Sequence, residues 1–213
     1  SGKYSISELE RIRDQNLVGI LQVLKNNEWG AGLTLKEFEE SLYNKAHKNV
    51  EQILNDYSKT LNLHSSEVRY DWLDYNGHMT ESRYLQVFGD ATDAFLKFIG
   101  MDEEYRAQGF SVYTVETHIR HLKEVSVGKF LSVQTQLLDF DEKRFRILHL
   151  MQNSFSGDVL ATSEHMMLHV NSKIGKASKF GSNLFEKLSL IWEGHKKLSL
   201  PEYAGKGIRN LKK

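Results

Sequence analysis

The stretch VRYDWLDYNGHMTESRYLQVFGDATDAFL, residues 68–96, decides the fold because it predicts three successive elements. Alternating apolar and polar residues over 66–72 predict a half-buried strand. The string DYNGHM at 74–79 predicts a tight turn. From residue 80 to Gly100 apolar residues recur at helical spacing and predict one long helix. The apolar positions of the strand and of the helix are Val68, Tyr70 and Trp72, and Tyr84, Val87, Phe88, Ala91, Ala94, Phe95 and Phe98.

The residues after this helix predict an antiparallel sheet. Apolar and polar residues alternate over 113–120 and 131–137, and two further strand-like runs, 144–152 and 159–170, flank a turn. One face of such a sheet needs a cover, and the long helix is the element available. We therefore expect an α+β fold in which an antiparallel sheet wraps around one long helix.

Helical segments are expected on both sides of this unit. Residues 1–63 hold two amphipathic patterns that predict two helices. Residues 173–213 predict a C-terminal amphipathic helix followed by an irregular basic tail. The expected division is therefore 1–63, 64–172 and 173–213.

The composition fits a globular protein and excludes several kinds of site. The 213 residues are 40% apolar and 26% charged, and there is no cysteine, which excludes disulfides, thiolate nucleophiles and cysteine-ligated metals. Apolar runs fall short of the ~18 residues of a membrane span. We expect a cytoplasmic protein without a membrane partner. Because Lys plus Arg and Asp plus Glu both number 28, a nucleic-acid partner is not expected either.

Asp74 is the first candidate for chemistry, because it stands between a strand and the start of a long helix. Unpaired amides at a helix N-terminus, together with the helix dipole, stabilise an anion or a developing oxyanion. A carboxylate beside them can act as nucleophile or general base on a polarised carbonyl. The alternative is a structural Asp-Asn-Gly turn with no chemistry.

The string at 68–96 and the strand pattern up to His169-Val170 resemble the hotdog-fold acyl-CoA thioesterases of the 4-hydroxybenzoyl-CoA thioesterase type. This resemblance covers about half of the chain. It implies a homodimer or higher homo-oligomer with the active site between subunits, and it makes Asp74 the catalytic aspartate. Gly77 and His78 then occupy the motif turn, and the oxyanion donor is a backbone amide near Glu81.

A second resemblance narrows the substrate. The stretch LVGILQVLKNNEWGAG at 17–32 is similar to the C-terminal end of dehydrogenases of the 3-hydroxyacyl-CoA type, particularly carnitine dehydrogenases. Some of these are fused to a hotdog thioesterase whose sequence is similar to residues 74–96. The resemblance implies hydrolysis of betainyl-CoA to glycine betaine and coenzyme A, on a chain fused to a dehydrogenase. Coenzyme A then enters as part of the substrate, and no other cofactor is expected.

A betainyl group is a fixed trimethylammonium cation, so its site should offer aromatic faces and carboxylates. A cation–π contact of this kind is worth ~0.5–2 kcal/mol. The alternative for the aromatic residues is that they form the core. The candidate substrate-binding residues are Trp72, Tyr75, Asn76, Tyr84, Tyr113, Glu116 and His118.

The nine histidines do not predict a metal site. His165 and His169 lie on one face of an expected strand rather than on a helix, and His118 and His121 fall on opposite faces, so neither pair forms a helical zinc site. His78 follows Gly77 and can orient Asp74, carry a proton, or form an ordinary hydrogen bond.

The charge is unevenly distributed along the chain. Residues 64–172 carry 10 basic and 16 acidic side chains, whereas residues 173–213 carry 10 and 3. This split matches in sign a cationic acyl group and the anionic coenzyme A, or it is solvated surface. The basic residues that could meet coenzyme A phosphates are Lys206, Arg209, Lys212 and Lys213.

Two other functions remain open from the sequence. The hotdog portion could be a non-catalytic acyl-CoA-binding or dimerisation module of a carnitine dehydrogenase fusion. It could also be a hotdog hydratase, which needs a different Asp–His arrangement that the sequence does not present at a convincing spacing.

Overall fold

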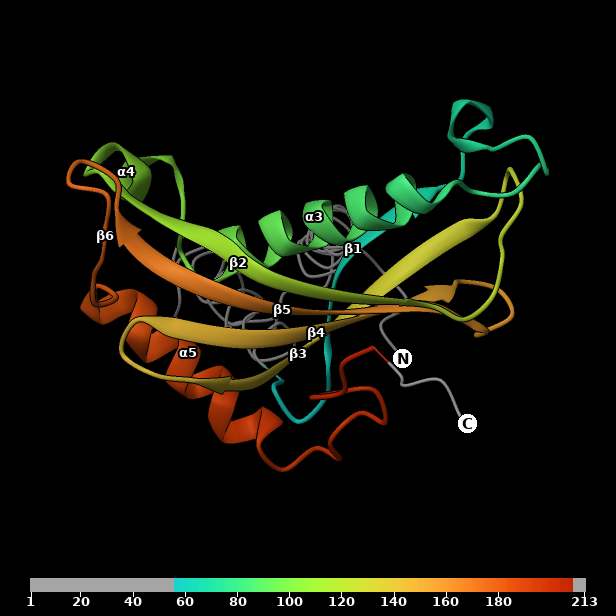
Figure 1. Ribbon diagram of the computed structural model, residues 1–213. Helices are drawn as coiled ribbons and strands as arrows, with labels where there is room; N and C mark the ends of the chain where they lie inside the picture. The colour runs from blue at the N-terminus through green and yellow to red at the C-terminus, as the bar shows by residue number, and fades with distance from the viewer. Residues whose placement is uncertain (1–55, 209–213) are drawn as a thin grey trace, which may run out of the picture. The chain divides into compact units, whose positions relative to one another are not determined.

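The structure is a computed structural model that describes residues 56–208 (Figure 1). Its strands form a six-stranded antiparallel sheet in the order β1-β3-β4-β5-β2, and the short β6 pairs with β5. In chain order the elements are β1 (Leu61–Glu67), the 3-10 helix η1 (Tyr70–Trp72), α3 (Glu81–Phe98), α4 (Glu103–Ala107), β2 (Phe110–His121), β3 (Phe130–Phe140), β4 (Arg144–Asn153), β5 (Val159–Asn171), β6 (Lys176–Ala177) and α5 (Ser182–His195).

The long helix α3 lies across one face of the sheet, as the sequence predicts (Figure 1). It begins after Thr80, whose backbone is extended, and carries Glu81 in its first turn, where a negative charge complements the helix dipole. Its buried residues follow the helical period and face the strands: Tyr84, Val87, Phe88, Ala91, Thr92 and Phe95.

Two apolar clusters fix the two ends of α3. Around the N-terminal half, Phe88 packs in a cluster with residues of β3, β4 and β5 such as Val133 and Met151. Around the C-terminal half, Phe95 shares a cluster with Leu137 of β3 and with Leu188 of α5. The start of α3, where the candidate site lies, is therefore anchored to a packed core.

A band of polar side chains lies between these clusters, under the middle of α3. His149 of β4 is fully buried and hydrogen-bonds Thr92 of α3 and Thr135 of β3, each at 2.9 Å. Thr92 also donates to the carbonyl of Phe88, so its oxygen accepts from His149 Nε2–H. His165 of β5 lies next to His149, with 5.2 Å between the ring centroids.

The other face of the sheet is partly covered by the segment that follows α5. Ala204 packs against Leu138 and Leu148, and the amide of Gly205 donates to Glu164 Oε2 at 2.6 Å. Within residues 56–208, no helix is long and apolar enough to cross a membrane.

The structure confirms the strands expected from 113 to 170 and the C-terminal helix, but the first strand was placed wrongly. The expected strand at 66–72 is replaced by β1 at Leu61–Glu67 and by η1. β1 escaped detection because its sequence LNLHSSE places polar His64 and Ser66 at positions that are only partly exposed. The two helices expected before it fall mainly on residues 1–55, which the structure does not describe. The division into three parts stays a prediction.

Candidate active site

A closed turn presents Asp74 immediately before α3. Leu73 and Met79 form an antiparallel bridge, and the amide of Asp74 donates to the carbonyl of His78 at 2.8 Å. Gly77 has φ of 79°, a left-handed conformation that the turn requires and glycine adopts readily. The amide of Thr80 donates to the carbonyl of Trp72 at 2.9 Å, which joins the turn to the helix start.

The carboxylate of Asp74 is held by groups of its own turn. Oδ1 accepts from the amide of Asn76 at 2.8 Å and from the amide of His78 at 3.3 Å, and Oδ2 accepts from the Asn76 side chain at 3.5 Å. Desolvation raises the pKa of Asp74, but these donors and the charge of His78 together outweigh it and hold the pKa below its usual value. Asp74 is therefore ionised at neutral pH and can act as nucleophile or base.

His78 is connected to a loop distant in the sequence. Its Nδ1 lies 3.3 Å from Glu124 Oε2, and its backbone forms an isolated bridge with Ser126. The next residue, Met79, donates its amide to the carbonyl of Val125 at 2.8 Å. These partners could not be predicted from the sequence, because they lie more than 40 positions away and belong to no local motif.

The N-terminus of α3 follows the Asp74 turn directly. Glu81 is the first helical residue and is exposed. The first amides of a helix have no acceptor within the helix, so they can stabilise negative charge on a ligand. Arg83 in the same turn adds a positive charge, with its guanidinium carbon 5.9 Å from the centre of the Trp72 ring.

Two of the candidate aromatic residues are core residues. Trp72 is 5% exposed, and Arg69 and Arg83 already lie over its ring. Tyr84 is 4% exposed, and its hydroxyl donates to the carbonyl of Lys123 at 3.3 Å. Their positions therefore favour packing over contact with a substrate cation. Tyr75, which follows Asp74, is by contrast 96% exposed, and Asn76 is exposed beside it.

The structure does not bring Tyr113, Glu116 and His118 to Asp74 within one chain. β2 has an irregularity between Thr114 and Glu116 that shifts the alternation of its side chains. Glu116 and His118 consequently line a cavity of about 420 Å³ on the sheet face opposite α3, with Lys206 of the tail. Tyr113 pairs with Leu168 and is 51% exposed.

The other residues singled out from the sequence lie apart from the Asp74 turn or outside the structure. His165 hydrogen-bonds Ser163 at 2.8 Å, and His169 lies 2.9 Å from the hydroxyl of Tyr105. Among residues 56–208, no group of three or more His, Asp or Glu side chains is arranged to hold a metal. The candidate phosphate-binding residues after position 208 lie outside the described residues.

The family model described as the thioesterase-like superfamily matches residues 68–188. The chain belongs to this superfamily. The matched region starts just before the Asp74 turn and ends within α5, so it contains the candidate site and the whole sheet apart from β1.

Relatives with longer and with shorter chains share this thioesterase-like sequence. The L-carnitine dehydrogenase/betainyl-CoA thioesterase of Agrobacterium fabrum is 50% identical over all of this chain, which spans 42% of that protein. The betainyl-CoA thioesterase of Pseudomonas aeruginosa is 39% identical over 71% of this chain and 96% of its own length. The chain therefore spans less than half of the first relative and nearly all of the second.

Two solved structures show the same fold. A putative thioesterase from Pseudomonas putida is 35% identical, with a TM-score of 0.63 over 72% of this chain and 98% of its own. A hypothetical protein from Staphylococcus aureus, solved in complex with CoA, has a TM-score of 0.67 over the same shares at 22% identity. The hotdog fold expected from the sequence is confirmed.

Proposed function

We propose that this chain hydrolyses an acyl-CoA thioester, and specifically betainyl-CoA to glycine betaine and coenzyme A. The observation that carries the proposal is the ionised Asp74 carboxylate in a closed turn at the start of α3. The choice of substrate is supported by the names of the Agrobacterium fabrum and Pseudomonas aeruginosa relatives.

The chemistry follows from the acceptor character of Asp74. As a general base, the carboxylate takes a proton from water, whose oxygen attacks the thioester carbonyl carbon; as a nucleophile, it attacks that carbon itself. In both cases the carbonyl oxygen becomes negative, and amides in the first turn of α3 near Glu81 stabilise it. Collapse of the tetrahedral intermediate expels the coenzyme A thiolate, which is then protonated. On the general-base route this step leaves glycine betaine; on the nucleophile route it leaves an anhydride with Asp74, which a water molecule then hydrolyses to glycine betaine and the free carboxylate.

Binding of the betainyl cation is assigned to the exposed side of the Asp74 turn. Tyr75 offers an accessible ring next to Asp74. A trimethylammonium group over such a ring gains ~0.5–1 kcal/mol at an exposed site. Trp72 is a weaker candidate than the sequence suggested, because two guanidinium groups would repel the cation.

This proposal assigns no coenzyme A contact to Lys206 within its own chain. Lys206 lies on the sheet face opposite α3, so within one chain it does not reach the side on which Asp74 lies.

We also propose a cytoplasmic homodimer, in a chain linked to a dehydrogenase. The support is the position of β2 at the end of the sheet, where a second copy can pair, and the longer relatives.

The test is thiol release from betainyl-CoA, acetyl-CoA and the neutral isostere 3,3-dimethylbutanoyl-CoA. We expect kcat/KM for betainyl-CoA to exceed that for the isostere at least several-fold, because only the cation gains from an aromatic face and nearby carboxylates. Equal values for the two would remove the betainyl assignment. No thiol release from any ester would favour the alternative, a non-catalytic binding or dimerisation module.

A further inference from the structure

The loop 122–129 between β2 and β3 contacts the Asp74 turn through three consecutive residues. Glu124 faces the imidazole of His78, the carbonyl of Val125 accepts from the amide of Met79, and Ser126 bridges the backbone of His78. Since the amide of His78 also donates to Asp74 Oδ1, this loop supports the part of the turn that holds the carboxylate.

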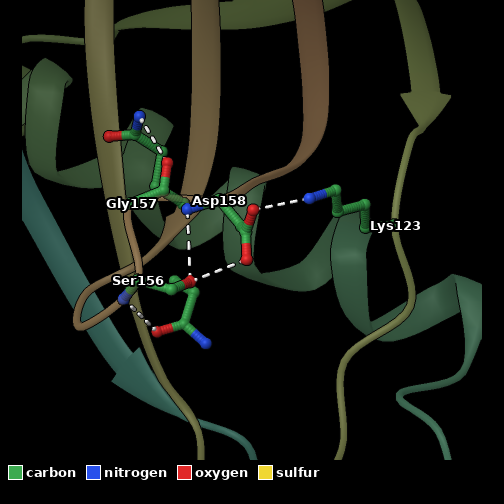
Figure 2. Close-up of polar contacts among 6 residues, drawn as sticks. Lys123, Ser156, Gly157 and Asp158 are labelled. Atoms are coloured by element: carbon green, nitrogen blue, oxygen red, sulfur yellow. Dashed lines mark hydrogen bonds and ion pairs between the residues drawn. The ribbon is translucent and has the colours of Figure 1, made fainter.

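Lys123 fixes this loop to three elements of the fold. Its amide donates to the carbonyl of Leu160 in β5 at 3.0 Å, and its carbonyl accepts from the hydroxyl of Tyr84 in α3. Its ammonium lies 2.5 Å from Asp158 Oδ1. Figure 2 shows Lys123 and Asp158 pointing toward each other. These contacts fix the backbone next to Glu124, although the side chain of Glu124 is itself 74% exposed.

Asp158 is itself fixed within the turn 154–158 between β4 and β5. Its Oδ2 accepts from the hydroxyl of Ser156 at 2.9 Å, and its backbone amide donates to the hydroxyl oxygen of Ser156 (Figure 2). Hydrogen bonds from Lys123 and Ser156 lower the pKa of Asp158, so the carboxylate is ionised and paired at neutral pH.

Tyr84 shows that these groups share one environment with Asp74. Burial raises the pKa of its hydroxyl, and the carboxylates of Glu124 and Asp74 raise it further. The buried hydroxyl of Tyr84 is therefore within electrostatic range of both carboxylates.

We propose that Glu124 is a positioning residue for His78, supported by the Lys123–Asp158 ion pair. The inference rests on the proposed function, in which Asp74 performs the chemistry. Glu124 accepts the Nδ1–H of His78, so whenever the imidazole is neutral it takes the tautomer with Nε2 unprotonated. The orientation of this ring, whose backbone amide donates to Asp74 Oδ1, is then set from a loop more than 40 residues away.

The experiment combines long-range nitrogen NMR of the His78 ring with thioester kinetics for Glu124→Ala and Asp158→Asn. In Glu124→Ala we expect the tautomer with the proton on Nε2 to gain population. We also expect kcat to fall about twofold to fivefold while KM stays within about twofold, the scale of an exposed ion pair. Asp158→Asn should change the tautomer population and kcat in the same direction as Glu124→Ala, but by a smaller amount.

The matched control is Glu142→Gln, which breaks an exposed ion pair with Lys179 that lies apart from the Asp74 turn. This variant should change neither the tautomer nor kcat. An unchanged tautomer in Glu124→Ala would overturn the proposal, as would a changed tautomer with unchanged kcat. The tautomer measurement needs no turnover, so it decides the contact even if hydrolysis proves independent of Asp74.

Discussion

At the scale of single residues, the Asp74 turn separates what local chemistry specifies from what the fold adds. The carboxylate, Asn76 and Gly77 belong to one short motif, so the sequence predicted their association. Glu124 and Val125 reach the same turn by tertiary packing, and no short pattern identifies them. The site was therefore predictable at its centre and not at its supports.

Gly77 provides a test of the turn itself. Gly77→Ala places a side chain in the left-handed region, which costs about 1–2 kcal/mol although no atom lies within 4 Å of the added Cβ. Gly77→Asn should cost less, because asparagine tolerates this conformation. We expect melting temperature and kcat/KM to be highest in the wild type, lower in Gly77→Asn and lowest in Gly77→Ala. Equal values for all three would show that the conformation at this position does not matter.

At the scale of elements, strong periodic patterns were predicted correctly and weak ones were not. The apolar stripe of α3 and the alternation in β3 and β4 reflect burial on a single face. β1 has a polar sequence and is stabilised by pairing with β3, which is distant in the chain. The bulge in β2 depends on register and moved Glu116 and His118 to the face opposite α3.

His195, at the end of α5, connects this helix to β3 and to the segment before β1. Nδ1 accepts from the amide of Leu137 at 2.8 Å, and Nε2–H donates to the carbonyl of Lys59 at 3.0 Å. His195→Ala leaves the buried amide of Leu137 and the part-buried carbonyl of Lys59 without this partner, so the free energy of unfolding should fall by about 2–3 kcal/mol in urea titrations. The exposed Glu193→Ala in the same turn should change it by no more than about 0.5 kcal/mol. Equal losses in both variants would contradict this role.

At the scale of the whole molecule, the fold encloses several histidines in neutral form. Burial lowers the pKa of each of four of them, and for His165 to about 4. Carbonyl acceptors partly oppose the shift at His169 and His195. The four are His149, His165, His169 and His195. A sequence shows nine histidines but not which of them the sheet and α3 cover.

Acid should therefore destabilise the protein before its carboxylates titrate. The unfolded chain binds protons at these histidines below about pH 6.5, while the folded chain does not until lower pH, so stability is full above 6.5 and falls toward pH 4. Each such group contributes up to about 1.4 kcal/mol per pH unit. Urea unfolding at pH 7.5 and at pH 5 measures this loss of stability. In His165→Gln the free energy of unfolding should depend less on pH than in the wild type. Identical free energies at both pH values would refute it.

The central claim is that the Asp74 carboxylate performs thioester hydrolysis at the start of α3. The most direct measurement is the rate of betainyl-CoA hydrolysis by Asp74→Asn, with the nearby exposed Asp71→Asn as control. We expect kcat to fall at least about a hundredfold in Asp74→Asn, with an unchanged melting temperature, because the amide has neither the charge nor the basicity of the carboxylate. Asp71→Asn should stay within about twofold of the wild-type rate. A folded Asp74→Asn variant with near wild-type turnover would contradict the claim.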